Sequence, residues 1–291
     1  MKENKALRVG NCFKEREPEN IIRDVKNTKT LTNKDVQDYR KMIARYFDVT
    51  RSQLLFSSGC LFIEGISECQ LVETFSRIMR KSLTEHQIEI VDTDGTAFYQ
   101  FMMLFNSSNE SKRLPIKAAF VTDEDQFTDS KNKEYTLDRL VENEYAQLQV
   151  LREGINNDDK NGRVNNMNTM TNNQPNVKVF SGQKTLEYQI CKANVTNLKS
   201  TTTNTWLYEL IKGDCPDDIS KVETYLETIE NDILEDEQQQ NVALLLWKCL
   251  PGKAGFAQRL DAFLSEKIQS ETDVKFSVPQ YIQNAINHLI A

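Results

Sequence analysis

Residues 54–68 read LLFSSGCLFIEGISE, and the fold expected for the rest of the chain follows from this stretch. The apolar run from Cys60 to Ile63 is typical of a buried strand, and Glu64 follows at its carboxyl end. Gly65 permits a tight turn, and the helix expected from about Ser67 carries a second carboxylate, Glu68. Since ligands of open α/β sheets bind beyond the carboxyl ends of the strands, acids in this position are candidates for chemistry.

A second apolar segment, residues 118–122, ends in the acidic run Asp123, Glu124 and Asp125. Asp123 and Asp125 flank a single residue, so an extended backbone points both side chains the same way. Carboxylates from separate strands supply the oxygen ligands that Mg²⁺ prefers, and clustered acids need a cation or protons to offset their repulsion. The alternative is that each acidic pair is a set of exposed residues favoured by a helix N-terminus.

Strand and helix patterns alternate around these two segments. Expected strands lie at 60–63, 88–91, 116–122 and 177–180, the last at a sheet edge; expected helices lie at 33–47, 67–79, 95–105 and 137–154. Strand–helix–strand units with short connections are typical of a parallel sheet with right-handed crossovers. Beyond residue 182 the apolar patterns are helical, at 186–195, 206–211, 222–233, 242–250, 254–268 and 281–289. The sequence therefore predicts an α/β fold, a mostly parallel sheet flanked by helices, with a C-terminal all-helical domain.

The expected organisation has three parts. Residues 1–50 form an N-terminal extension and a leading helix, residues 51–182 form the α/β core, and residues 183–291 form a helical domain that completes the site. Within the core, residues 156–176 contain nine asparagines, one glycine and one proline, which predicts a mobile loop. Residues 214–237 carry ten carboxylates against one lysine, which indicates a solvated helical face or, alternatively, a partner-binding surface. Trp206 and Trp247 lie in apolar helical patterns and are expected in the core.

Composition excludes several classes of protein. A net charge of −7 argues against binding nucleic acid over the whole surface, although a local basic patch remains open. Six cysteines without a C-x-x-C pair, and only two histidines, argue against zinc and for reduced thiols. No apolar run approaches the ~18 residues of a membrane span, and the N-terminus lacks a signal-peptide core. A cytoplasmic protein without a membrane segment is expected.

The two acidic motifs, FIEG at 62–65 and TDED at 122–125, resemble the TOPRIM fold of topoisomerases, primases and related nucleases. The surrounding sequence resembles more closely the C-terminal half of OLD-family (overcoming lysogenisation defect) nucleases, including the nuclease subunit of Gabija-type defence systems. The similar segments occur in the same order along the chain: YFDVTRSQLLFSSGCLFIEGISE from 46, GTAF from 95, AAFVTDED from 118, KTLEY from 184, PGKAGFAQRL from 251 and FSVPQYIQNAI from 276.

This resemblance implies roles for individual residues. The residues that match the TOPRIM metal ligands are Glu64, Glu68, Asp123 and Asp125. Glu187, with Thr185 before it, matches a later acidic motif that completes the site around a second metal, and Lys253 matches a lysine near the scissile phosphate. Read from the residues alone, Glu187 is an acid at a helix start, Thr185 its N-cap, and Lys253 a solvated lysine at the start of the next helix.

The function implied by the resemblance is a DNA endonuclease or nickase that uses Mg²⁺ or Mn²⁺, two ions per site, in anti-phage defence. Paired cations can activate water and stabilise the leaving oxygen, while a lysine neutralises charge on the phosphate. Catalysis would rest on Glu64, Asp123 and Lys253. Two departures from the family are Asp94, where glycine is commoner, and Glu124, which adds a charge inside the aspartate motif.

The expected partners are DNA and an ATPase. No G-x-x-x-x-G-K-[ST] motif occurs, so no nucleotide site is expected in this chain. The resemblance therefore implies an ABC-type ATPase, either as a separate subunit or as an absent N-terminal half, and a homo-oligomer is possible. The rival interpretation is a non-catalytic TOPRIM scaffold that docks an ATPase or senses DNA. A primase- or topoisomerase-like enzyme is a weaker alternative, because zinc-finger cysteines and a clear tyrosine nucleophile are missing from the sequence.

Overall fold

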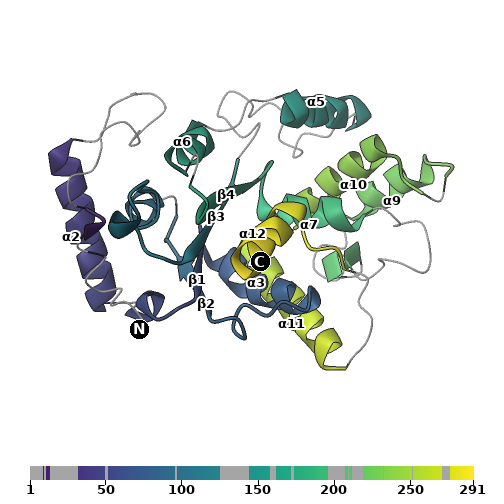
Figure 1. The fold of residues 1–291 in the computed structure, drawn as a ribbon. Helices are drawn as coiled ribbons and strands as arrows, with labels where there is room; N and C mark the ends of the chain where they lie inside the picture. Colours follow the sequence, from purple (N-terminus) through teal and green to yellow (C-terminus); the bar gives the residue numbers. More distant parts are fainter. Residues whose placement is uncertain are drawn as a thin grey trace.

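Four parallel strands form one sheet in the computed structural model of this chain. The structure describes residues 9, 11–13, 32–49, 52–95, 97–124, 144–157, 162–171, 174–195, 207–208, 210–211, 219–231, 233–250, 252–270 and 276–291. The strands are β1 (Gly59–Ile63), β2 (Ile88–Asp92), β3 (Lys117–Asp123) and β4 (Val177–Gly182), in the order β2-β1-β3-β4 (Figure 1). Each pairing is parallel, and β4 lies at an edge, so both expectations are confirmed.

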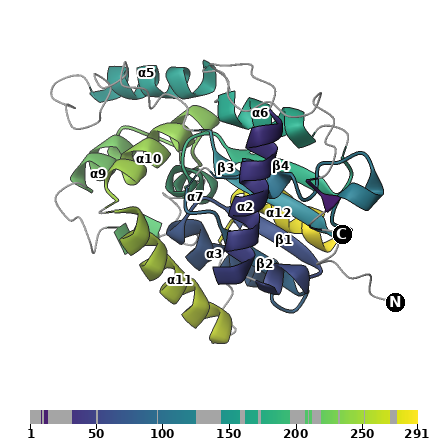
Figure 2. The same ribbon diagram turned by 90° about the vertical axis from the view of Figure 1, so that its left-hand side faces the viewer.

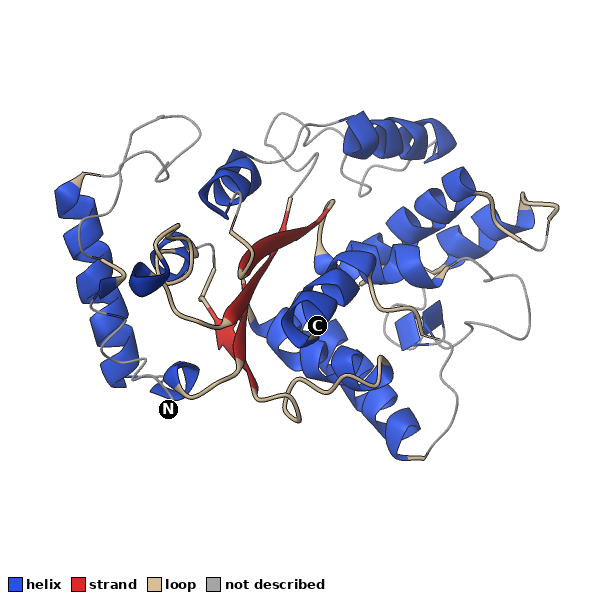
Figure 3. Ribbon diagram, viewed as in Figure 1, coloured by secondary structure: helices blue, strands red, loops and turns tan. Residues whose placement is uncertain are grey.

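The two central strands are continuous apolar runs because helices cover both of their faces (Figure 3). All five residues of β1 are buried, and β3 is buried from Ala118 to Asp123. On one side lie α2 (Asn33–Val49), the short α4 (Tyr99–Met102) and α6 (Gly162–Thr171), with α2 crossing in front of the sheet in Figure 2. An aromatic cluster fills this side: Phe62, Phe98, Phe101, Phe105 and Phe120.

The opposite side of the sheet is covered by helices from both halves of the chain. These are α3 (Ile66–Ile78), α7 (Leu186–Asn194), α11 (Lys253–Gln269) and α12 (Gln280–Ile290), with α5 (Glu144–Asn157), α9 (Ser220–Glu227) and α10 (Asp236–Lys248) farther out (Figure 1). α11 packs against α3, and α12 packs against β3 and β4. One apolar core joins Leu61 and Ile63 of β1 to these helices. The described elements beyond β4 are all helical, as expected, while a domain boundary at residue 182 stays a prediction.

The expectation of a mobile loop over residues 156–176 is wrong for most of its length. α5 continues to Asn157, and α6 forms from Gly162 to Thr171. Val164, Met167 and Met170 are spaced three residues apart and are at most 2% exposed, so they make one buried helical stripe against α4 and β4. The segment as a whole has the composition of a loop, but its three apolar residues recur at helical spacing among the asparagines.

Several helix boundaries also differ from those expected. The helix expected over 95–105 is reduced to the four residues of α4, and the helix expected over 222–233 ends at Glu227. Residues 137–143 and most of 201–218 lie outside the described residues. Two 3₁₀ turns, Ser52–Leu55 and Glu110–Lys112, lead toward β1 and β3. In the described ranges, no helix is both long enough and apolar enough to cross a membrane.

Candidate active site

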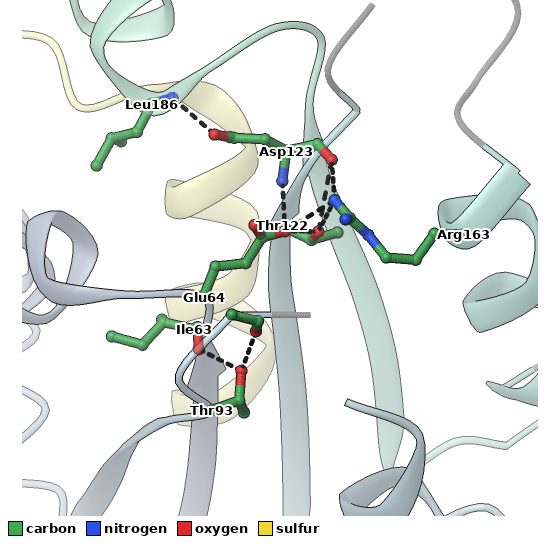
Figure 4. A network of polar contacts seen from close by, with 8 residues as sticks. Ile63, Glu64, Thr93, Thr122, Asp123, Arg163 and Leu186 are labelled. Carbon is green, nitrogen blue, oxygen red and sulfur yellow. Dashed lines mark hydrogen bonds and ion pairs between the residues drawn. The ribbon is translucent and has the colours of Figure 1, made fainter. Parts of the chain in front are cut away.

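Glu64 lies at the carboxyl end of β1, where hydrogen bonds fix both its backbone and its carboxylate (Figure 4). Its carbonyl oxygen accepts a hydrogen bond of 2.7 Å from the Gly95 amide. Its Oε1 accepts hydrogen bonds from the Thr122 hydroxyl and, at 3.2 Å, from the Asp123 amide. The tips of β1 and β3 are therefore joined through one carboxylate oxygen, as the sequence predicted for two acidic strand ends at one edge.

Arg163 of α6 is a site residue that the sequence analysis missed. Its Nη2 lies 3.0 Å from Glu64 Oε1, 3.1 Å from Thr122 Oγ1 and 2.8 Å from the Asp123 carbonyl oxygen (Figure 4). The side chains of Arg163 and Glu64 are only 18% and 21% exposed. The sole available signal was that Arg163 and Lys160 are the only basic residues in the asparagine-rich segment, and that Arg163 precedes the buried Val164.

Asp123, the last residue of β3, and Glu124, which follows it, have different hydrogen-bond partners. Asp123 is 8% exposed, and its Oδ2 accepts a hydrogen bond of 3.3 Å from the Leu186 amide at the start of α7. Glu124 is turned toward β4: its amide donates to the Gly182 carbonyl at 2.7 Å, and its carboxylate accepts from the Ser181 hydroxyl. The extra charge of Glu124 is thus held by β4. Asp125 lies outside the described residues.

The electrostatics of Glu68 bring together residues from four separate elements. Burial, followed by the charges of Glu187 and Glu64, raises the pKa of Glu68 to about 7, while a backbone hydrogen bond and Lys253 act in the opposite direction. Charges act this way only when they are close together. Glu68 of α3, Glu64 after β1, Glu187 of α7 and Lys253 of α11 therefore share one site, although they are far apart in sequence.

Glu187 and Thr185 occupy the first turn of α7. The Thr185 hydroxyl accepts a hydrogen bond of 3.3 Å from the Tyr188 amide, so Thr185 is an N-cap, and a role as metal ligand stays a prediction. Glu187 is only 3% exposed, and within the described part of the chain its Oε2 has no hydrogen-bond partner. An ordinary acid at a helix start would reach solvent, so burial favours the functional interpretation of Glu187. Lys253 is the first residue of α11 and is exposed.

Tyr281 of α12 is a second residue that the sequence analysis did not single out. Burial, followed by the charges of Asp123, Glu68, Glu187 and Glu64, raises the pKa of its hydroxyl well above the ordinary value. Its ring lies against Gly182: a Cβ at that glycine would come within 3.0 Å of the Tyr281 ring. Any larger residue would displace the ring, so glycine at position 182, the end of β4, makes room for the Tyr281 side chain beside the carboxylates. Its segment, FSVPQYIQNAI, carried a family resemblance without a role.

The donors at this edge suit a hard divalent cation. They are carboxylate oxygens, which Mg²⁺ and Mn²⁺ prefer. The buried Oε2 of Glu187 has no hydrogen-bond partner within the described residues, and burial, followed by the charges of Glu187 and Glu64, raises the pKa of Glu68. Among the described residues, which exclude Asp125, no three acidic, histidine or cysteine side chains converge as a complete metal-binding group. The donor chemistry therefore fits a divalent cation, although the described side chains alone do not form a complete site.

Comparison with known protein families finds a match to part of the chain. Residues 55–125, from the 3₁₀ turn before β1 to just beyond β3, match the model of the family "Overcoming lysogenization defect protein-like, TOPRIM domain". This segment is an OLD-like TOPRIM domain. It includes Glu64, Glu68, Asp123 and Asp125, and membership of this family is consistent with a nuclease. No curated protein matches the chain.

Two solved structures of C-terminal regions of OLD proteins are similar to this chain at low sequence identity. The Xanthomonas campestris pv. campestris region is 18% identical, covering 82% of this chain and 94% of that one, with a TM-score of 0.43. The Burkholderia pseudomallei region is also 18% identical, covering 80% of this chain and 97% of that one, with a TM-score of 0.45.

Within the TOPRIM domain, the departure at Asp94 has a simple geometry. Asp94 is exposed and has a φ of 52°, in the left-handed region where glycine is favoured and aspartate is tolerated. Its amide donates a 2.9 Å hydrogen bond to Asp92 Oδ1, which stabilises the turn locally. Its exposure indicates that Asp94 is a surface acid rather than a residue that alters the metal environment.

Proposed function

We propose that this chain is a divalent-metal-dependent DNA endonuclease or nickase that hydrolyses phosphodiester bonds with two cations per site. The observation that supports this most strongly is the convergence of Glu64, Glu68, Glu187 and Lys253 from four elements, with Glu187 buried and its Oε2 unpartnered within the described residues. Buried carboxylates that repel one another are costly unless a cation joins them. A cation bound at this edge of the sheet would offset the repulsion between these carboxylates, so the site is suited to binding a metal.

The residues divide the work according to their positions. In this proposal Glu64, Glu68, Asp123 and Asp125 hold one cation, and Glu187 with Thr185 completes the site around the second. When bound, the ions supply an activated water and stabilise the leaving oxygen. The Thr122 hydroxyl and the Asp123 amide fix the orientation of the Glu64 carboxylate. Lys253, exposed at the start of α11, neutralises charge that builds on the phosphate.

The Arg163 contact favours the second candidate, a non-catalytic TOPRIM scaffold that docks an ATPase or senses DNA. A guanidinium 3.0 Å from Glu64 Oε1 already supplies positive charge, and a scaffold would need no further cation there. In the nuclease proposal the same arginine orients the Glu64 carboxylate. A bound metal would displace Arg163 from Glu64 Oε1, and its guanidinium would then contact a phosphate. We further propose that the protein acts in the cytoplasm in defence against phage. Its partner in this proposal is an ABC-type ATPase, either a separate subunit or another part of the same protein, and the assembly is a homo-oligomer.

Plasmid nicking in Mg²⁺ or Mn²⁺ tests the proposal. Glu64→Ala and Asp123→Ala each remove a ligand and should lower the nicking rate at least about 100-fold. Asp94→Asn is the matched control, because it removes an exposed charge at the same edge and keeps a residue that tolerates a positive φ; it should nick like the wild type. Equal nicking by the wild type and both alanine variants would show that the ligand assignment is wrong.

Calorimetric titration with Mn²⁺ separates the nuclease from the scaffold. A nuclease should bind Mn²⁺ at a site that Asp125→Ala weakens or abolishes, whereas Asp94→Asn should leave that binding unchanged. A chain that neither nicks DNA nor binds Mn²⁺ at a site sensitive to Asp125 is a scaffold.

A further inference from the structure

A small pocket lies next to the acid cluster and has no assigned ligand. Its volume is about 240 Å³, and it is lined by Glu187 of α7, Trp247 and Lys248 of α10, Leu250 and Gly252 of the connecting turn, and Lys253 of α11. Cavities that hold drug-sized ligands measure roughly 300–1,000 Å³, so this one suits a single ring system. Because it shares Glu187 and Lys253 with the candidate active site, a bound group would lie beside the phosphate of the proposed reaction.

The walls of the pocket combine an aromatic surface with two cations. Trp247 was expected in the core, but it is only partly buried. The Nζ of Lys184 lies over its ring, 5.1 Å from the centroid, and Lys184 is itself only 2% exposed, so this cation–π contact holds the indole from the interior side. Trp247 and Leu250 supply the apolar part of the pocket lining. Lys248 and Lys253 are exposed at the rim.

We propose that this pocket binds one unpaired nucleobase of the DNA strand that is cut, the base adjacent to the phosphate that Lys253 contacts. This inference rests on the proposed function and names its substrate class. An indole stacks on a base of any identity, which suits an enzyme without sequence preference, and the two ammonium groups meet the flanking phosphates. A base inside a duplex has its faces covered by its neighbours, so only an unstacked base enters.

The consequence concerns the structure of the DNA that is cut. Single strands, flaps, frayed ends and nicked or distorted duplexes offer an unstacked base without further cost. Intact duplex must first unpair and unstack one, which costs free energy and weakens binding. The enzyme therefore distinguishes DNA by the availability of an unpaired nucleotide at the cut.

Tryptophan fluorescence tests binding separately from cleavage. Trp206→Phe leaves Trp247 as the only tryptophan of the chain. This variant is titrated, with chelator and again with Ca²⁺, with an oligothymidylate, an abasic oligonucleotide with the same number of phosphates, a blunt duplex, and thymidine monophosphate. The oligothymidylate should quench Trp247 and bind at least about 5-fold more tightly than the abasic strand, since stacking contributes about 1–3 kcal/mol per base. The blunt duplex should quench weakly.

Substitution of Trp247 supplies the second arm, measured by anisotropy of labelled oligonucleotides. Trp247→Leu keeps an apolar side chain against the core and should weaken oligothymidylate binding about 5-fold to 150-fold, with abasic binding unchanged. Trp247→Phe keeps a ring and should restore most of the affinity. The Trp206→Phe chain is the matched control and should bind like the wild type, and thermal unfolding checks that all variants fold.

Each outcome decides a separate point. Equal affinity for thymidylate and abasic strands, or equal binding by Trp247→Leu and the wild type, overturns the base pocket. Thymidine monophosphate that binds as tightly as the strand shows a site for free nucleotides and overturns the strand assignment. Base-dependent binding without nicking would support the base pocket and contradict the proposed nuclease activity. Nicking with base-independent binding would contradict the base pocket alone.

Discussion

The bodies of β1 and β3 and the tips of the same strands differ sharply in chemistry. In the bodies, the rings of Phe62 and Phe120 stack with centroids 4.5 Å apart and planes 7° apart, and neither ring is exposed. The rings of Phe101 and Phe105 lie 5.2 Å and 5.7 Å from that of Phe62. Immediately beyond these neutral rings, at the tips, Glu64 joins Asp123, and Glu68 lies close enough to Glu187 and Glu64 for their charges to add to the effect of burial on its pKa.

The difference shows how the fold sustains an unfavourable site. Apolar burial and ring contacts stabilise the strand bodies, whereas like charges destabilise the tips. A network of weakly compensated carboxylates therefore persists only because the adjoining core holds the strands in register. Perturbing each region separately should give effects of opposite kind.

The largest effect is expected in the strand bodies. Phe62→Ala empties the middle of the aromatic cluster and should lower the free energy of unfolding by about 3–5 kcal/mol. Denaturant unfolding followed by circular dichroism measures this loss. Phe56→Ala is the matched control, because Phe56 is 80% exposed and its removal should change stability by no more than about 0.5 kcal/mol. Similar losses for the two variants would contradict the description of the core.

A smaller effect, of opposite sign, is expected for Glu68→Gln at the tips. The pKa of Glu68 rises from its ordinary 4.5 to about 7 in the folded chain. Stability contributed by the protonated carboxyl is therefore fully present below about pH 4.5 and is lost as the pH rises through 7. In chelator, Glu68→Gln should be more stable than the wild type at pH 8, on the order of 2 kcal/mol.

Denaturant unfolding of both chains between pH 4.5 and pH 8 checks this prediction. The stability difference should shrink toward the acid end, because the wild-type carboxyl of Glu68 becomes protonated in the folded state as the pH falls below 7. At pH 8, Mn²⁺ should stabilise the wild type more than Glu68→Gln, because the ion needs the charged ligand. A stability difference that does not change with pH would show that Glu68 has an ordinary pKa.

The smallest change in stability is expected for a substitution of Arg163, which contacts Glu64 at the strand tips. Arg163→Gln removes the guanidinium that bonds Glu64, Thr122 and the Asp123 carbonyl, and it should lower stability in chelator by about 1–2 kcal/mol. The increase in melting temperature on adding Mn²⁺ should then exceed that of the wild type, because the ion replaces the lost charge and no longer competes with the Arg163 guanidinium for Glu64.

Lys41→Gln provides the control for Arg163. Lys41 lies 3.6 Å from Asp38 on the surface, with side chains 79% and 50% exposed, so its loss should cost no more than about 0.5 kcal/mol. Its response to Mn²⁺ should equal that of the wild type. An Arg163→Gln chain with an unchanged Mn²⁺ response would show that Arg163 does not share Glu64 with a metal.

Features that depend on residues adjacent in the chain could be predicted from the sequence, whereas features that depend on contacts between distant segments could not. β1, β3 and their acidic tips were predicted because a run of buried residues and the acid after it are adjacent in the chain. α6 was not, since three apolar residues among asparagines become a buried stripe only when α4 and β4 lie beneath them. The short α4 shows the same limit, because the apolar residues after Gly95 pack as a cluster rather than as the long helix that their spacing favoured.

The sequence by itself determined the parallel α/β core and the acids at its carboxyl edge, because both follow from local patterns of polarity and from the geometry of parallel strands. The resemblance of scattered segments also named Glu187 and Lys253 before their positions were known. Only the tertiary structure decided what surrounds those acids: Arg163 against Glu64, Tyr281 in the space left by Gly182, and Trp247 at the mouth of a pocket. These neighbours depend on how helices from distant parts of the chain pack together, which no local pattern encodes.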